Sequence, residues 1–157
     1  MWRLAETVVE PRVFLKVCVP SEELVAMLPR RWVLQADSYV MTCAGSFKSD
    51  LRLPDGYAMQ LSTAGPVASV KILADDGTLA ANGHAAAYDG VFIYDRIATD
   101  AAHRRLGLGR AVMSALQTAR RETSSTQILV ATAEGRALYA SLGWVLHAPY
   151  CTAVIPA

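Results

Sequence analysis

The sequence has little of several features that would assign it to a particular class of protein. Its three cysteines, Cys18, Cys43 and Cys151, are far apart and form no CxxC pair, so neither a disulfide framework nor a zinc site is expected. No apolar run approaches the roughly 20 residues of a membrane-spanning helix, and the N-terminus lacks the apolar core of a signal peptide. We therefore expect a cytoplasmic protein with no metal ion and no membrane association.

An excess of charge of one sign is also missing. The chain has 15 Lys and Arg against 14 Asp and Glu, so its bulk charge does not favour nucleic acid as a partner. Hydrophobic residues make up 53% of the chain and charged residues 18%, which is typical of a folded domain rather than of disorder. Because 157 residues are enough to bury one continuous core, we expect a single domain over residues 1–157.

The first third of the chain gives weak structural signals. Residues 1–11 are mixed in character, so we expect an irregular lead-in. The segments that follow are expected to be a strand at 12–19, a helix at 21–28 that Pro29 interrupts, a second helical piece at 30–36 and a short strand at 39–43. Residues 37–53 are otherwise hard to interpret, and we favour a plain connection there over a loop that covers a substrate.

From Tyr57 onward the pattern is that of β-strands. Strands are expected at 57–63, 67–74, 79–88 and 91–99, with turn signals at Asp75-Asp76-Gly77-Thr78 and Asp89-Gly90. A helix with Val112 and Leu116 on one face should follow. The rest is expected to be a buried strand at 127–131, a helix that Thr132 caps and Gly143 ends, and two strands, 144–148 and 150–155, separated by Pro149.

The stretch RRLGLGR at 104–110 lies between the last strand of the meander and its helix. Two glycines flank one leucine here, and arginines stand on both sides. Free backbone N–H groups at a helix start, together with the positive end of the helix dipole, bind anions such as phosphate. The stretch lacks the GxxxxGK[ST] phosphate loop and fails the last position of GxGxxG. From these residues alone it is either a phosphate site or a permissive turn that begins a helix.

Two motifs, and the order of elements around them, resemble the GNAT superfamily of acyl-CoA N-acyltransferases. The segment RRLGLG from Arg104 fits the family's [QR]xxGx[GA] pyrophosphate loop, and LYASLGW from Leu138 fits its LYxxxG[FWY] helix ending. The resemblance is specific over 67–144 and vague before Tyr57. It implies the GNAT fold, an α/β protein of the α+β type. Its mixed, mostly antiparallel central sheet is splayed between the fourth and fifth strands and flanked by helices.

The resemblance also implies acetyl-CoA as cosubstrate. Backbone groups of Ile97, Ala98 and Thr99 would pair with pantetheine, while the diphosphate would be held by Arg104, Arg105, Leu106, Gly107, Leu108, Gly109 and Arg110. The N–H groups from Arg105 to Arg110 are the expected donors. For each arginine side chain, a phosphate contact and solvated surface are equal alternatives. His103 is either close to the adenosine 3′-phosphate or a plain loop histidine.

The expected catalytic residues are Tyr139 and Asp95. Tyr139 matches the family's tyrosine near the coenzyme sulfur, where it would donate a proton to the departing thiolate; the alternative is an aromatic that only packs. Asp95 is the expected base for the amine, or it is simply ion-paired with its neighbour Arg96. His84 is a second candidate for the base. Tyr94 and Tyr88 would either line the acceptor pocket or fill the core.

The chain departs from the family pattern at the start of its last helix. Thr132 stands where many members have asparagine, and Gly135 replaces a common alanine. Thr132 can still cap the helix. The departure puts in doubt any contact that an asparagine amide would make.

Together these features predict an N-acetyltransferase that transfers the acetyl group of acetyl-CoA to a primary amine of a small molecule or peptide by direct attack. The alternatives are a non-catalytic acyl-CoA-binding regulatory module and a protein or peptide N-acetyltransferase. Analogy with the family also allows a homodimer. The acceptor is not readable, because it depends on loop shapes and on residues 37–57.

Overall fold

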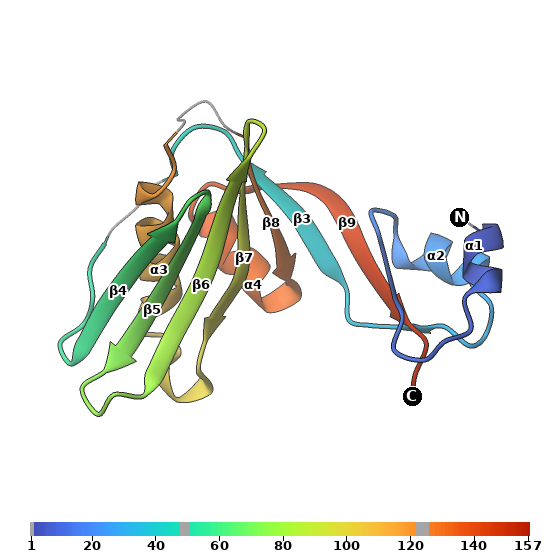
Figure 1. Cartoon of the computed structure of the whole chain (residues 1–157), viewed down its shortest axis with the longest axis horizontal. Coiled ribbons are helices and arrows are strands. Elements are labelled where there is room, and N and C mark those ends of the chain that lie inside the picture. The colour runs from blue at the N-terminus through green and yellow to red at the C-terminus, as the bar shows by residue number, and fades with distance from the viewer. Residues whose placement is uncertain (1, 48–50, 122–125) are drawn as a thin grey trace. The chain divides into compact units, whose positions relative to one another are not determined.

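The computed structural model describes residues 2–47, 51–121 and 126–157 (Figure 1). Its chain divides into two compact units. The first comprises Met1–Met41, Val130–Ala140 and Val145–Ala157, and the second comprises Thr42–Leu129 and Ser141–Trp144. Two unit boundaries fall inside strands β3 (Ser38–Cys43) and β8 (Thr126–Thr132). A third falls inside α4 (Ala133–Ser141), and the fourth lies directly before β9 (Val145–Val154).

The second unit is built on an antiparallel meander (Figure 1). Its strands are β4 (Tyr57–Ala64), β5 (Val67–Ala74), β6 (Leu79–Tyr88) and β7 (Val91–Thr99), and β8 begins beside β7 in parallel orientation. The turn signals work as predicted. Asp76 Oδ1 accepts from the N–H of Thr78 at 2.9 Å. Asp89 and Gly90 both have positive φ, as a two-residue hairpin turn requires.

Helix α3 (Leu108–Thr118) covers one face of the meander, in contact with β5, β6 and β7 (Figure 1). The predicted apolar stripe is confirmed, since Val112, Met113 and Leu116 are buried. The helix packs closely over Gly83 of β6. A Cβ at this position would lie 2.5 Å from Ile97 Cδ1 and 2.7 Å from Val112 Cγ1. Only glycine therefore allows this packing distance.

Strand β7 has two irregular features that bear on the predicted splay. Its register with β6 shifts between Asn82 and His84, opposite Arg96, whose φ is +51°. This is a β-bulge, which bends a strand locally. Among the described residues, β8 pairs with β7 only from Val91 to Tyr94. The pairing of β7 with β8 thus ends at Tyr94, between the two strands where the family resemblance predicts the splay.

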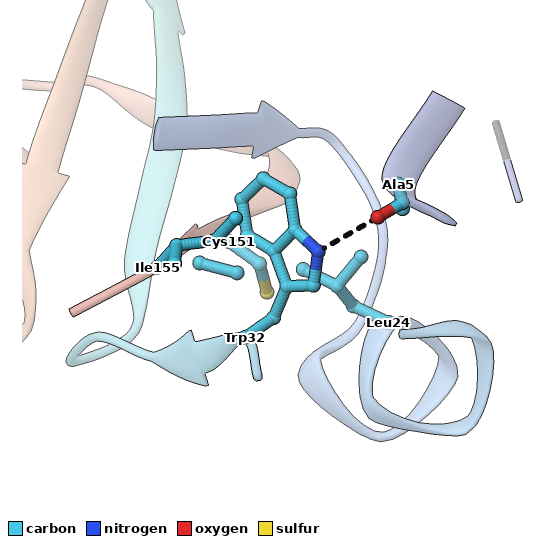
Figure 2. Packing of buried hydrophobic residues seen from close by; sticks show 6 residues of the cluster. Ala5, Leu24, Trp32, Cys151 and Ile155 are labelled. Carbon is cyan, nitrogen blue, oxygen red and sulfur yellow. Dashed lines mark hydrogen bonds between the residues drawn. The ribbon is translucent and has the colours of Figure 1, made fainter. Parts of the chain in front are cut away.

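The first unit contains α1 (Trp2–Thr7), β1 (Phe14–Val17), α2 (Ser21–Met27) and β2 (Val33–Leu34), together with most of α4 (Ala133–Ser141) and all of β9 (Val145–Val154). Strands β1 and β2 both pair antiparallel with β9. The core cluster of this unit consists of Ala5, Leu24, Trp32, Cys151, Ala153 and Ile155 (Figure 2). The Trp32 indole N–H donates to the Ala5 carbonyl at 3.0 Å, as the dashed line in Figure 2 marks.

Three predictions for the ends of the chain are wrong. Residues 1–11 are not irregular, because α1 forms there and Arg31 donates to its terminal carbonyls of Ala5 and Glu6 at 2.8 and 2.6 Å. Residues 30–36 contain β2 rather than a helix, because they pair with β9. The two closing strands are one strand, β9, which continues through Pro149. Pro149 lies before the segment that pairs with β1, so its missing N–H costs no bond to that strand.

The remaining elements agree with the sequence pattern. The predicted strands at 67–74, 79–88 and 91–99 match β5, β6 and β7 residue for residue. The sheet pairs are mostly antiparallel and helices accompany them, which confirms the predicted fold class. The connection predicted within residues 37–53 falls partly on residues 48–50, which lie outside the described residues. No helix in the described ranges is long and apolar enough to cross a membrane.

Candidate functional site

The predicted phosphate loop is a defined turn between a short 3-10 helix (Ala101–His103) and α3. Asp100 begins it by accepting from the N–H of Ala102 at 2.9 Å. Arg105 and Gly107 then adopt left-handed backbone conformations, with φ of +66° and +79°. The first helical bond follows, from the N–H of Ala111 to the carbonyl of Gly107 at 3.0 Å. The left-handed residues turn the backbone so that α3 starts at Leu108.

Four successive N–H groups at the start of α3 have no protein acceptor among the described residues. They are the N–H groups from Gly107 to Arg110. The first N–H groups of any helix lack intrahelical acceptors, and the helix dipole adds positive potential at the same end. Successive N–H groups around left-handed residues form anion-binding concavities. The turn can therefore hold an anion through its backbone.

A groove of about 340 Å³ lies beside the turn. Leu106, Gly107 and Arg110 line one part of it, and Arg52, Leu53 and Pro54 line the rest. Two arginines therefore border one hollow, although they are far apart in the sequence. Arg110 also donates to Ser141 Oγ at 3.2 Å, which anchors its guanidinium. Sequence reasoning missed residues 52–54, because no local pattern indicates that they meet the turn.

His103 precedes the turn and contacts the start of the meander. Its Nδ1 lies 2.8 Å from the Tyr57 hydroxyl, and the two rings meet edge to face with their centroids 5.7 Å apart. The histidine is thus held in place rather than free in a loop. Its contact with a 3′-phosphate stays a prediction.

Ile97, Ala98 and Thr99 follow the bulge in β7. Ala98 pairs with Asn82 and Thr99 with Ala81, so one edge of this segment belongs to the meander. Among the described residues, the other edge has no pairing to β8 beyond Tyr94. The Ile97 side chain packs over Gly83. The backbone contacts of these three residues with pantetheine stay a prediction.

The two candidate bases lie in different surroundings. Asp95 Oδ2 is 3.0 Å from Arg96 Nε, and both side chains are largely exposed, by 62% and 79%. The ion pair that the sequence left open is therefore present. His84 is half-buried on β6, and its Nδ1 lies 2.9 Å from the Ser69 Oγ. Both residues stay predictions for the base.

Tyr139 lies in α4 and is only 7% exposed. Burial raises the pKa of its hydroxyl to about 12, so the group is protonated at neutral pH. The ring lies over Gly135, where an added Cβ would approach Tyr139 Cε2 to 3.2 Å. The glycine that departs from the family pattern thus makes room for this tyrosine. Thr132 caps the helix as predicted, accepting from the N–H of Gly135 at 3.1 Å.

The two other tyrosines that the sequence offered for the acceptor pocket, Tyr94 and Tyr88, differ in burial. Tyr94 is a core residue, whose hydroxyl donates to Gln127 Oε1 at 2.7 Å and whose ring contacts Trp144 at 5.3 Å. Burial raises the pKa of the Tyr94 hydroxyl. Tyr88 is 81% exposed at the turn between β6 and β7, so it does not fill the core.

Sequence reasoning also missed a buried arginine that anchors the segment after β3. Arg120 is 9% exposed and donates to the Gly45 carbonyl at 2.7 Å. Gln117 accepts from the N–H of Phe47 at 3.1 Å. Two polar residues near the end of α3 therefore hold part of the connection that the sequence left undefined.

Comparison with known proteins assigns the chain to a family. The family model described as an acetyltransferase (GNAT) domain matches residues 67–146. A comparison with curated proteins found no match. A GCN5-related N-acetyltransferase from Sphaerobacter thermophilus is 13% identical, with a TM-score of 0.67, over 96% of this chain and 62% of that one.

Two further solved structures share the fold. A GCN5-related N-acetyltransferase from Kribbella flavida is 16% identical, with a TM-score of 0.59, over 80% of this chain and 60% of that one. A GCN5-related N-acetyltransferase-like protein from Streptococcus suis is 16% identical, with a TM-score of 0.64, over 85% of this chain and 66% of that one. The chain thus spans about 60% of the length of the first two structures. From the family match and the motifs at its turn and last helix, the chain belongs to the GNAT acetyltransferases.

Proposed function

We propose that this protein transfers the acetyl group of acetyl-CoA to a primary amine of a small molecule or peptide. The observation that carries the proposal is the run of free N–H groups from Gly107 to Arg110, beside a groove that two arginines border. A diphosphate needs several donors and positive charge at one point, and this turn offers both. Family membership makes the diphosphate of coenzyme A the natural occupant.

The coenzyme would extend from this turn along β7. The backbone of Ile97, Ala98 and Thr99 has an edge that β8 does not pair with, and pantetheine amides can pair with such an edge as a strand would. The side chains there are small or packed. This arrangement supports the backbone contacts expected from the family resemblance.

The chemistry requires a neutral amine and a protonated leaving group. The amine nitrogen attacks the thioester carbonyl, a C–N bond forms, the amine loses a proton and the C–S bond breaks. A free amine has a pKa of about 10, so a base that removes its proton increases the reactive fraction at neutral pH. We assign Tyr139 to protonate the departing thiolate, on the basis of its motif and of a pKa that keeps it protonated.

Calorimetric titration with acetyl-CoA and with S-acetylpantetheine tests the coenzyme assignment. The two compounds share the thioester, and only acetyl-CoA carries the diphosphate. We expect acetyl-CoA to bind at least about tenfold more tightly, which corresponds to about 1.4 kcal/mol. Arg110→Gln should weaken acetyl-CoA binding, whereas Arg121→Gln, an exposed arginine outside the groove, should leave it unchanged. No binding at millimolar coenzyme would sink the proposal.

The acceptor is tested separately by thiol release from acetyl-CoA with aliphatic, aromatic and peptide amines. Release that depends on one amine class identifies the substrate class. Coenzyme binding with no release from any amine would instead favour the non-catalytic acyl-CoA-binding alternative.

A further inference from the structure

Three polar residues form a row across the central strands of the meander. Ser69 on β5 is the register partner of His84 on β6, and His84 is the partner of Asp95 on β7. Residues directly opposite each other in antiparallel strands project to the same face, with Cβ atoms about 4.5–5.5 Å apart. A hydroxyl, an imidazole and a carboxylate therefore lie in sequence on one face of this sheet.

This face is the one that α3 leaves open. The neighbours of the row along each strand, Val70, Gly83 and Tyr94, project to the opposite face and are buried there. Ser69 and His84 are half-buried, and Asp95 is exposed. The row can therefore be reached from solvent, while its backbone belongs to three paired strands.

The bond between Ser69 Oγ and His84 Nδ1, 2.9 Å long, sets the orientation of the ring. If Nδ1 carries the proton of the neutral imidazole, Ser69 accepts it and Nε2 keeps a free lone pair. The charged groups nearby are Asp95 and Arg96 on β7, which pair with each other at 3.0 Å, and Lys71 on β5. Asn82 lies opposite Lys71, one pair further along the same face.

The row ends next to the segment that the coenzyme proposal uses. Asp95 immediately precedes the bulge at Arg96, and Ile97 to Thr99 follow it. We propose that His84 is the general base of the transfer, with Ser69 positioning its ring and Asp95 stabilising the imidazolium that forms. This inference rests on the proposed function and adds to it a base supplied by the strand next to β7.

Nε2 of His84 takes the proton that the amine nitrogen loses while its C–N bond to the acetyl carbon forms. The C–S bond breaks, and the thiolate takes a proton from Tyr139. The imidazolium then releases its proton to water, and the Tyr139 phenolate takes a proton back from water. No other reactant is needed.

Kinetics with the best acceptor from the amine panel test the base. We expect His84→Gln to lower kcat roughly 100-fold at neutral pH, the lower end of what a general base contributes, with acetyl-CoA affinity unchanged. His147→Gln, the same change at an exposed histidine on β9, is the matched control. Turnover within twofold of wild type in H84Q would overturn the proposal and leave the coenzyme assignment standing.

A second measurement needs neither acceptor nor turnover. Imidazole ¹⁵N shifts of the full chain at alkaline pH report which nitrogen of neutral His84 carries the proton. We expect the Nδ1–H form in wild type and in Ser69→Thr, and a change to the Nε2–H form in Ser69→Ala. An Nε2–H form in wild type would overturn the assignment, because Nε2 would then have no lone pair for the amine proton. Failure of wild type to bind acetyl-CoA would instead overturn the proposed function, and this inference with it.

Discussion

Gly83 is the position where the packing between α3 and the sheet can be tested most directly. An alanine Cβ there would lie 2.5 Å from Ile97 Cδ1 and 2.7 Å from Val112 Cγ1, with Leu116 Cδ1 at 3.3 Å. Carbon atoms pack at about 3.5–4.0 Å, so two contacts are too short by about 1 Å. Ile97 can rotate its terminal methyl away. Val112 cannot, because a helical valine has one strongly preferred rotamer.

The expected cost follows from these contacts. Overpacking of a core costs about 1–3 kcal/mol, and replacing glycine by alanine returns about 0.4–1 kcal/mol through the unfolded chain. We therefore expect Gly83→Ala to lower the free energy of unfolding by about 1–2 kcal/mol. At this chain length the midpoint of thermal unfolding should fall by roughly 3–6 °C. The start of α3 should shift with the helix, so acetyl-CoA binding should weaken as well.

Urea unfolding of Gly83→Ala, Val112→Ala and the double variant measures both the cost and its cause. Val112→Ala removes the clashing methyl group, so it should cost less in the alanine background than in wild type. The coupling free energy should be about 0.5–2 kcal/mol. The steric reasoning would be refuted if Gly83→Ala were as stable as wild type, or if the effects of the two substitutions were strictly additive.

Four other predictions test separate parts of the structure. Tyr139→Phe should lower kcat at least tenfold, within the usual range for a general acid, without changing acetyl-CoA affinity. The raised pKa of Tyr139, about 12, means that its stabilising contribution is complete below about pH 10 and is lost as pH rises toward 12. Thr132→Ala should cost about 1 kcal/mol, because the N–H of Gly135 loses its cap, and Thr132→Ser should restore it. Trp32→Phe should cost about 1–2 kcal/mol, because the Ala5 carbonyl loses the indole N–H.

Each of these expectations has a measurement that can contradict it. Full turnover in Tyr139→Phe would exclude the hydroxyl as the proton donor. Urea midpoints between pH 8 and pH 12 should fall less steeply in Tyr139→Phe than in wild type, and parallel curves would contradict the burial argument. Thermal midpoints rank the Thr132 variants, with alanine expected lowest. Amide hydrogen exchange in α1 should accelerate in Trp32→Phe, and unchanged exchange there would show that the indole bond is not needed to hold the helix.

The parts of the structure that sequence reasoning predicted well depend on neighbours in the chain. Strands β5, β6 and β7 are defined by alternating side chains and by hairpin turns of two to four residues. The cap at Thr132 and the left-handed Gly143 are likewise local. For the same reason the loop motif at Arg104 predicted the turn and the start of α3.

The errors lie where a distant partner decides the conformation. Residues 30–36 have a weak helical pattern, but pairing with β9 makes Val33 and Leu34 a strand. Residues 1–11 have no strong pattern, and α1 depends on donors from Arg31 and Trp32. A proline normally interrupts a strand, but β1 does not pair with β9 at Pro149, so the missing N–H costs no bond to β1.

By itself the sequence determined the family, the predicted coenzyme turn and most of the meander, because each depends on residues within a few positions of one another. Only the tertiary structure decided that Arg52 borders the same groove as Arg110, and that Ser69, His84 and Asp95 stand in one row. The register of paired strands decides which residues stand opposite each other. That register depends on backbone hydrogen bonds and turns that can lie many residues away in the chain. No single segment carries that information. The sequence named Asp95 and His84 as separate candidates, and only the folded sheet places them side by side.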